Sequence, residues 1–184
     1  MKNLLGQFDI SEDRVRALVA DTINGADDGE LYLEYSESEA LMFDNGRLKT
    51  ANFTTDQGFG LRAVAGEATG YAHASELSEA ALLRASDAVS TVKSGYSGTL
   101  AAAPARTNVH LYGDDNPIAS PSFAEKAKLL QEIDAWVRAR DPRVRQVTAS
   151  LSASWQHVEI VRADGQIVRA DAPSPSRSES ISRT

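Results

Sequence analysis

The stretch that decides the fold is LYLEYSESEALMFDNGRLKTANFTTDQGFGLRAVAGEATGYAHA, residues 31–74. Its start alternates with period two, because Leu31 and Leu33 would point to one side of a strand and Tyr32 and Glu34 to the other. Similar short runs follow at 40–43, 47–55, 59–64 and around 71. Gly-containing turns at 44–46 and 65–67 separate them. This pattern predicts an antiparallel meander.

Three helices are predicted outside the meander. Ser11 is a suitable N-cap for the first helix, which Asn24 and Gly25 end. Ser78 caps the second, and the third opens at Pro121 and Ser122. Pro142 ends the third helix because a proline disfavours helical geometry at the residue before it.

Strands are predicted again after the third helix, at 144–152 and 156–161, with a turn around 153–155 and a last strand that starts at Gln166. The stretch 94–121 is predicted to be a long surface connection with one short strand at 108–112. The order of elements indicates an α+β fold, a mainly antiparallel sheet with about three helices packed on one face.

Length and composition favour one globular domain over residues 1–171, since 42% of the 184 residues are hydrophobic. Residues 172–184 are rich in Ser, Arg and Pro and nearly free of apolar side chains, so we expect this tail to be disordered. The chain has a net charge of -7, and its Lys and Arg residues form no cluster that could bind nucleic acid. The absence of cysteine and of long apolar runs predicts a soluble, cytoplasmic protein without a membrane partner.

Residues with catalytic potential form no convincing motif. The chain has three histidines, His73, His110 and His157, and none belongs to the HExxH pattern that places two imidazoles on one helix face. His157, next to Trp155, is expected to decorate a hairpin turn. The sequence therefore predicts no catalytic, cofactor-binding or metal-binding residue in this chain.

Two weaker groupings of residues also have purely structural explanations. His73, Glu76 and Asp56 could meet and bind a metal or move a proton, but surface residues flanking a helix start are the commoner arrangement. Gly58-Phe59-Gly60 lacks the third glycine of a phosphate loop and precedes a strand, so these glycines more plausibly permit close backbone approach or a bulge. No Gly-x-Ser-x-Gly nucleophile motif is present.

Several segments, taken in order, carry a family resemblance: 35–39, 43–49, 57–64 and 66–72, then 144–147 and 160–165. The first four resemble the N-terminal domain of the TldD-type zinc metallopeptidases, the family of TldD and its paralogue TldE, also called PmbA, and the last two are similar to the same family's next hairpin. The glutamate-containing run 31–35 is closer to TldD than to TldE.

The resemblance implies a cytosolic heterodimer of TldD-like and TldE-like subunits that cleaves unfolded or leader peptides. It also implies that zinc is bound by an HExxxH pair and a cysteine in a C-terminal domain. No position of this chain matches those ligands, so the chain is expected to be the non-catalytic N-terminal portion and to be inactive alone.

The resemblance departs after Asp171, where the family continues with an apolar strand. A frameshift or an artificial chain end would produce such a change, and we treat the tail as a candidate out-of-frame segment. Two other functions stay open: a stand-alone peptide- or protein-binding domain without enzymatic activity, and an intrinsic hydrolase that uses His73 and Glu76.

Overall fold

A computed structural model describes residues 3–100, 102, 116 and 118–183, with the backbone alone described from 172 onward. Contacts divide the chain into two compact units. The first unit comprises Met1–Tyr35, Asp56–Gly113 and His157–Asp171, and the second comprises Ser36–Thr55, Asp114–Gln156 and Ala172–Thr184. The predicted short strand at 108–112 lies outside the described residues.

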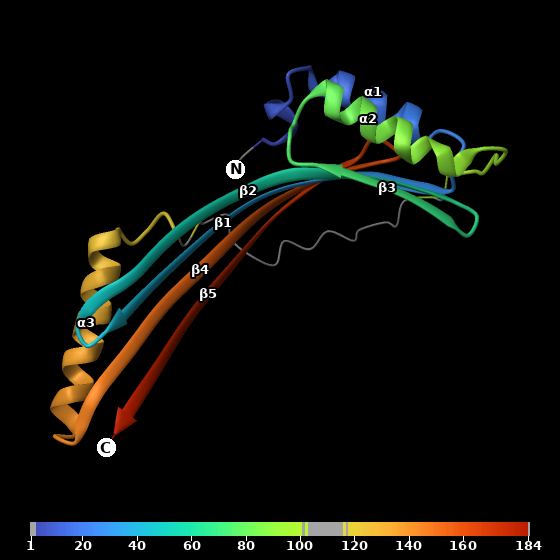
Figure 1. Ribbon diagram of the computed structural model, residues 1–184. Helices are drawn as coiled ribbons and strands as arrows, with labels where there is room; N and C mark the ends of the chain where they lie inside the picture. The colour runs from blue at the N-terminus through green and yellow to red at the C-terminus, as the bar shows by residue number, and fades with distance from the viewer. Residues whose placement is uncertain (1–2, 101, 103–115, 117, 184) are drawn as a thin grey trace. The chain divides into compact units, whose positions relative to one another are not determined.

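The described elements comprise five strands in one sheet of order β3-β2-β1-β4-β5, three α-helices and two short 3-10 helices (Figure 1). The sheet and helices confirm the α+β prediction. The strands are β1 (Asp28–Asp44), β2 (Arg47–Ala65), β3 (Ala68–Ala74), β4 (Val144–Arg162) and β5 (Ile167–Arg183). The helices are η1 (Leu5–Gln7), α1 (Glu12–Ile23), α2 (Glu79–Ser90), η2 (Thr91–Lys93) and α3 (Phe123–Arg140).

The helices begin where their caps predict. Ser11 accepts a hydrogen bond from the Arg14 N–H, and Ser78 accepts one from the Ala81 N–H. Ser122 and Glu125 form a reciprocal capping box at the start of α3. These bonds satisfy backbone donors that the first turn of a helix leaves without partners.

Tight turns join neighbouring strands at the predicted places. Asn45 and Gly46 have φ of 51° and 69° between β1 and β2. Gly66, with φ of 60°, turns β2 into β3, and the two strands then pair antiparallel from Ala65↔Ala68 to Phe59↔Ala74. Glycine and asparagine are the residues that tolerate this left-handed backbone geometry.

The core of the first unit lies between α1, α2 and one face of the strands. Alternate strand residues, including Leu31, Leu33 and Leu61, are fully buried there together with Val15 of α1 and Leu82 of α2. Figure 1 shows α1 and α2 side by side over β3 and the adjoining part of β2.

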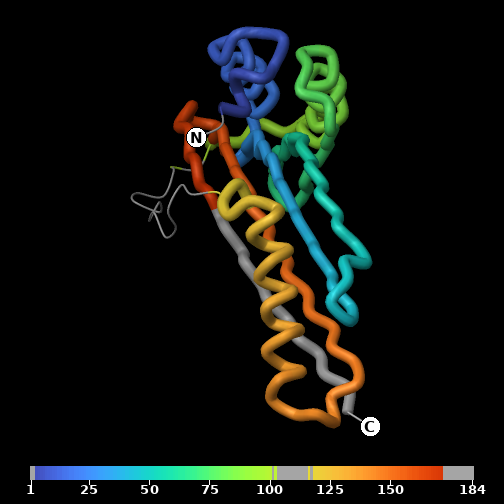
Figure 2. Tube along the Cα trace, turned by 90° about the vertical axis from the view of Figure 1, so that its left-hand side faces the viewer, coloured from blue at the N-terminus to red at the C-terminus, as the bar shows by residue number. Residues whose placement is uncertain are grey.

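The core of the second unit is smaller and lies under α3. Leu130 of α3 packs with Leu41, Phe43 and Ala149. Further along the helix, Val137 belongs to a cluster that includes Val147 and Val144 of β4. The course of α3 beside β4 can be followed in Figure 2.

The strands are longer than predicted. Each of β1 and β2 is continuous where two runs were predicted, and β4 passes straight through Ala153–Trp155, where the predicted turn is wrong. Those three residues have no positive φ, and alternating burial continues beyond them. The backbone of β5 extends to Arg183, so the structure has a strand where the sequence predicts a disordered tail from residue 172. Pairing with β4 engages the β5 backbone and does not depend on apolar side chains.

Neighbouring leucines on α2 provide a test of the first core. Leu82 is 1% exposed and Leu83 is 40% exposed. We expect Leu82→Ala to lower the free energy of unfolding by about 2–5 kcal/mol, because it removes buried methyl groups and leaves a cavity. Urea unfolding followed by circular dichroism measures the change. Leu83→Ala is the matched control, and equal losses in the two variants would contradict the position of the core.

Candidate functional site

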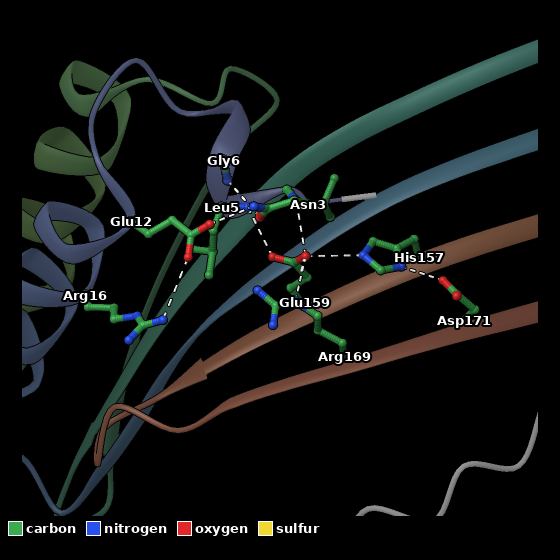
Figure 3. A network of polar contacts seen from close by, with 10 residues as sticks. Asn3, Leu5, Gly6, Glu12, Arg16, His157, Glu159, Arg169 and Asp171 are labelled. Carbon is green, nitrogen blue, oxygen red and sulfur yellow. Dashed lines mark hydrogen bonds and ion pairs between the residues drawn. The ribbon is translucent and has the colours of Figure 1, made fainter. Parts of the chain in front are cut away.

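A buried network of charged side chains lies in the first unit, on β4 and β5 (Figure 3). His157 and Glu159 are both fully buried, and Asp171 is 4% exposed. The His157 Nδ1 lies 2.5 Å from Asp171 Oδ1, and its Nε2 lies 3.3 Å from Glu159 Oε1. A carboxylate oxygen can only accept, so both contacts are hydrogen bonds when the imidazole carries a proton on each nitrogen.

Glu159 also holds the N-terminal segment. Its Oε1 accepts from the Leu4 N–H at 3.2 Å, and its Oε2 accepts from the Leu5 N–H at 3.1 Å. These N–H groups stand at the start of η1, where no helical carbonyl is available to them. Arg169 of β5 adds an ion pair, with its Nε 3.1 Å from Glu159 Oε1. One carboxylate therefore joins the N-terminal segment to β4 and β5.

The balance of these contacts favours the charged form of Glu159. Burial on its own would raise the pKa of this carboxyl group. The Leu5 N–H, the Arg169 guanidinium, His157 and the Leu4 N–H outweigh that effect and hold the pKa below its ordinary value. Glu159 is thus a structural anion, and because both it and His157 are fully buried, neither side chain presents a surface on which a substrate could react.

His157 corrects a prediction from the sequence. The sequence predicts that it decorates a hairpin turn, but it lies within β4 and is fully buried. The alternation of Trp155, His157, Glu159 and Val161, all buried, is the pattern of one covered strand face. The same spacing is present in the sequence, but the polar residues His157 and Glu159 interrupt the apolar pattern that would mark a buried strand face.

The other candidate residues do not assemble into a site. His73 lies on β3 and its ring stacks with Tyr71 at 5.8 Å, while Glu76 forms an exposed ion pair with Arg84 at 3.8 Å. The Asp56 carboxylate accepts from the N–H of its own neighbour Gln57. No hydrogen bond or ion pair between His73 and Glu76 occurs in the described part of the chain. His110 lies outside the described residues.

The described residues do not form a metal centre. No group of three or more His, Cys, Asp or Glu side chains among them is placed to hold a metal ion. Both ring nitrogens of His157 contact carboxylates, so neither nitrogen is available as a zinc ligand and this network does not fit a zinc ion.

The glycines of Gly58-Phe59-Gly60 have a structural role, as interpreted from the sequence. A Cβ at Gly58 would lie 2.7 Å from the backbone oxygen of Ala74, and a Cβ at Gly60 would lie 2.6 Å from the Tyr71 hydroxyl. Gly60 lies in the stretch of β2 that pairs with β3, and Gly58 lies one residue before that stretch begins. The two glycines permit close approach of β3 and do not form a phosphate loop.

In the second unit, β1 holds α3 and the segment before it by ionic contacts. Lys126 of α3 is 4% exposed, forms an ion pair with Glu39 and donates to the Ile118 carbonyl at 2.8 Å. Asn116 donates to Glu37 at 2.7 Å. Removing one member of such a buried pair would leave the other charge uncompensated, so these residues fix the start of α3 on β1.

A shallow hollow lies on the sheet of the second unit. It is bounded by β1, β2 and β4, and its lining is mostly small and polar. The lining residues are Ser38, Glu39, Ala40, Asn52, Thr54, Ser152, Ala153 and Ser154. Hydroxyl and amide side chains of this kind can donate to and accept from a polypeptide backbone without selecting a particular sequence.

Comparison with known proteins assigns the class. Residues 29–94 match the family described as PmbA/TldA metallopeptidase domain 1, and residues 116–176 match the PmbA/TldA metallopeptidase central domain. The chain is 33% identical over 169 residues to a metalloprotease TldD homolog of Haemophilus influenzae, covering 90% of this chain and 33% of that protein. It is 32% identical over 156 residues to a TldD homolog of Buchnera aphidicola, covering 84% of this chain and 32% of the relative.

Solved structures show the same fold. A protein described as a putative modulator of DNA gyrase from Bacteroides thetaiotaomicron aligns with a TM-score of 0.71 at 14% identity, covering 94% of this chain and 41% of its own. TldE from Thermococcus kodakarensis aligns with a TM-score of 0.61 at 12% identity, covering 94% and 43%.

The two domain matches, in family order, and the TldD relatives place this chain in the PmbA/TldD metallopeptidase family. This confirms the resemblance found in the sequence. The chain spans about a third of the length of the curated relatives it matches. In the part of the chain that the structure describes, no helix has the length and apolar character of a membrane span.

Glu159 predicts a specific dependence of stability on pH. Because its folded pKa is lowered, its stabilising contribution is complete above the unfolded value of about 4.3 and is lost as the pH falls through the lower folded value. We expect Glu159→Gln to be less stable by about 3 kcal/mol at pH 7, since it leaves buried donors and Arg169 without their charge partner. Urea unfolding between pH 7 and pH 3 should show the difference shrinking on acidification. Glu76→Gln, at an exposed pair, is the control, and a gap that stays constant with pH would refute the charge assignment.

The two glycines of β2 form a second matched pair. At Gly58 an added methyl group would meet the backbone of Ala74, which cannot move alone, whereas at Gly60 it would meet the outer end of the exposed Tyr71 ring. We expect Gly58→Ala to lower the free energy of unfolding by about 1–3 kcal/mol and Gly60→Ala to have a clearly smaller effect. Thermal unfolding compares them, and the reverse order would contradict the packing of β3.

Proposed function

We propose that this chain supplies the N-terminal, non-catalytic domains of a TldD-like metallopeptidase. The observation that carries the proposal is the match of residues 29–94 and 116–176 to the family's first and central domains, in that order. The identity to TldD homologs extends over 90% of the chain. The catalytic zinc centre would then belong to the two thirds of the relatives that this chain does not match.

The chemistry of the described residues supports a non-catalytic role. The most strongly organised charged groups, His157 and Glu159, are fully buried and serve the N-terminal segment. The exposed candidates His73 and Glu76 have other partners, Tyr71 and Arg84 respectively. Among the described residues no hydrogen bond or ion pair orients His73 toward Glu76, so the geometry lends no support to the hydrolase hypothesis that uses these two residues.

We further propose a PmbA/TldE-like subunit as the partner, unfolded or leader peptides as substrates, and the cytoplasm as the location. The family resemblance supports the choice of partner and substrates. The fold that this chain shares with TldE is consistent with such a pair of related subunits. The absence of cysteine suits a reducing compartment. In this assembly the chain would help to form the subunit pair and shape the chamber through which a peptide reaches zinc.

The test uses the 184-residue chain and a PmbA/TldE-like subunit. We expect a complex in analytical ultracentrifugation, and no hydrolysis of labelled casein by the chain alone with or without added zinc. Turnover by the chain alone that His73→Ala abolishes would overturn the non-catalytic assignment. A chain that binds peptide yet ignores the subunit would instead support the alternative of a stand-alone binding domain.

A further inference from the structure

The outer edge of β2 is unpaired over part of its length. β3 has seven residues and pairs with β2 from Phe59 to Ala65. On its other side β2 neighbours β1. No described strand therefore pairs with the outer edge of residues 47–55, which we call the free edge. At about 3.3 Å per residue the free edge is about 30 Å long.

The free edge lacks the proline, the bulge and the covering element that often keep a sheet edge from pairing, and its protective charges are confined to Arg47 and Lys49 at one end. Every residue from 47 to 55 is exposed. The segment RLKTANFTT contains no proline and no glycine, and no positive φ interrupts it. Natural proteins usually cover such an edge or break it with a proline or a bulge, because its free N–H and C=O groups can accept another strand.

The free edge borders the hollow described above. Asn52 and Thr54 of the free edge form part of the hollow's lining, together with Ser152 and Ser154 of β4. A strand added beside β2 would direct alternate side chains toward the same face. The hollow offers those side chains space and polar groups, in addition to the backbone hydrogen bonds that the free edge of β2 can form.

The positive charge of the free edge favours the binding of some added polypeptide segments over others. Arg47 and Lys49 are exposed, and neither forms an ion pair in the described structure. No acidic residue occurs between 47 and 55, although the whole chain has a net charge of -7. The free edge is thus a basic segment of an acidic protein, and it complements an extended segment that carries carboxylates.

We propose that the free edge of β2 binds an extended, acidic polypeptide segment by strand addition, with alternate side chains of that segment over the hollow. The inference rests on the proposed function, since it locates where a peptide is held before it reaches a catalytic domain. A permanent subunit interface fits less well, because Leu48 and Phe53 are the only large apolar side chains of the segment. Strand addition instead draws its affinity from backbone hydrogen bonds, which suits peptides of varied sequence.

The experiment uses the full 184-residue chain and a fluorescein-labelled nine-residue peptide of alternating Glu and Thr. Fluorescence anisotropy should show saturable binding, and hydrogen exchange should show slower exchange at residues 47–55 when the peptide is present. The same peptide methylated at every backbone nitrogen cannot donate to the edge. We expect its affinity to be at least about tenfold weaker.

Charge reversal separates the basic edge from general electrostatics. We expect Arg47→Glu with Lys49→Glu to weaken binding by about tenfold, and to favour a peptide of alternating Lys and Thr instead. The control, Arg84→Glu with Lys128→Glu, makes the same change in net charge at two exposed helix positions and should alter affinity by no more than about twofold.

Three results would overturn the inference. They are unchanged binding of the methylated peptide, protection from exchange at α3 in place of residues 47–55, and dimerisation of the chain through the free edge without peptide binding. The ultracentrifugation test with the PmbA/TldE-like subunit is separate. If that complex forms while the peptide does not bind, the proposed function stands and the strand-addition inference fails.

Discussion

Burial of one face of long strands is the constraint on which the rest of this structure depends. Successive strand residues point to opposite sides, so a strand such as β1 has one set of apolar side chains to cover along its whole length. In the first unit α1 and α2 cover Leu31 and Leu33. In the second unit α3 covers Leu41 and Phe43 of the same strand. Each unit needs its own helices because the strand runs through both.

The same constraint explains why charged residues that resemble a catalytic group are structural. His157, Glu159 and Asp171 lie on covered strand positions, where an unpaired charge would be costly. Arg169 and two N–H groups of the N-terminal segment compensate the Glu159 carboxylate, and His157 contacts one oxygen of Asp171. The N-terminal segment in turn brings Leu4 and Leu5 into the core. At Glu159, hydrogen bonding of a buried carboxylate and burial of apolar side chains therefore reinforce each other.

The sequence predicted the parts of the fold that local chemistry determines. Serine caps marked the helix starts, and Asn45-Gly46 and Gly66 marked two turns, because each signal acts within a few residues. The lengths of the strands were not predictable in this way. Ala153–Trp155 has small and polar residues that suggested a turn, yet β1 and β5 on either side hold β4 extended. The Glu159 network joins residues 155 positions apart, and no local pattern indicates such a pairing.

The position of charge in this chain also limits how it can contribute to a peptidase. The anions with the strongest internal contacts are directed inward, to the N-terminal segment and to the start of α3. One surface that remains for a partner is the part of β2 that β3 leaves uncovered, where residues 47–55 are all exposed. Backbone recognition is tolerant of side-chain identity, because every residue but proline offers the same donor and acceptor. Under the proposed function, in which the chain helps to hold extended peptides, an edge of this kind would accept more sequences than a pocket shaped for one side chain.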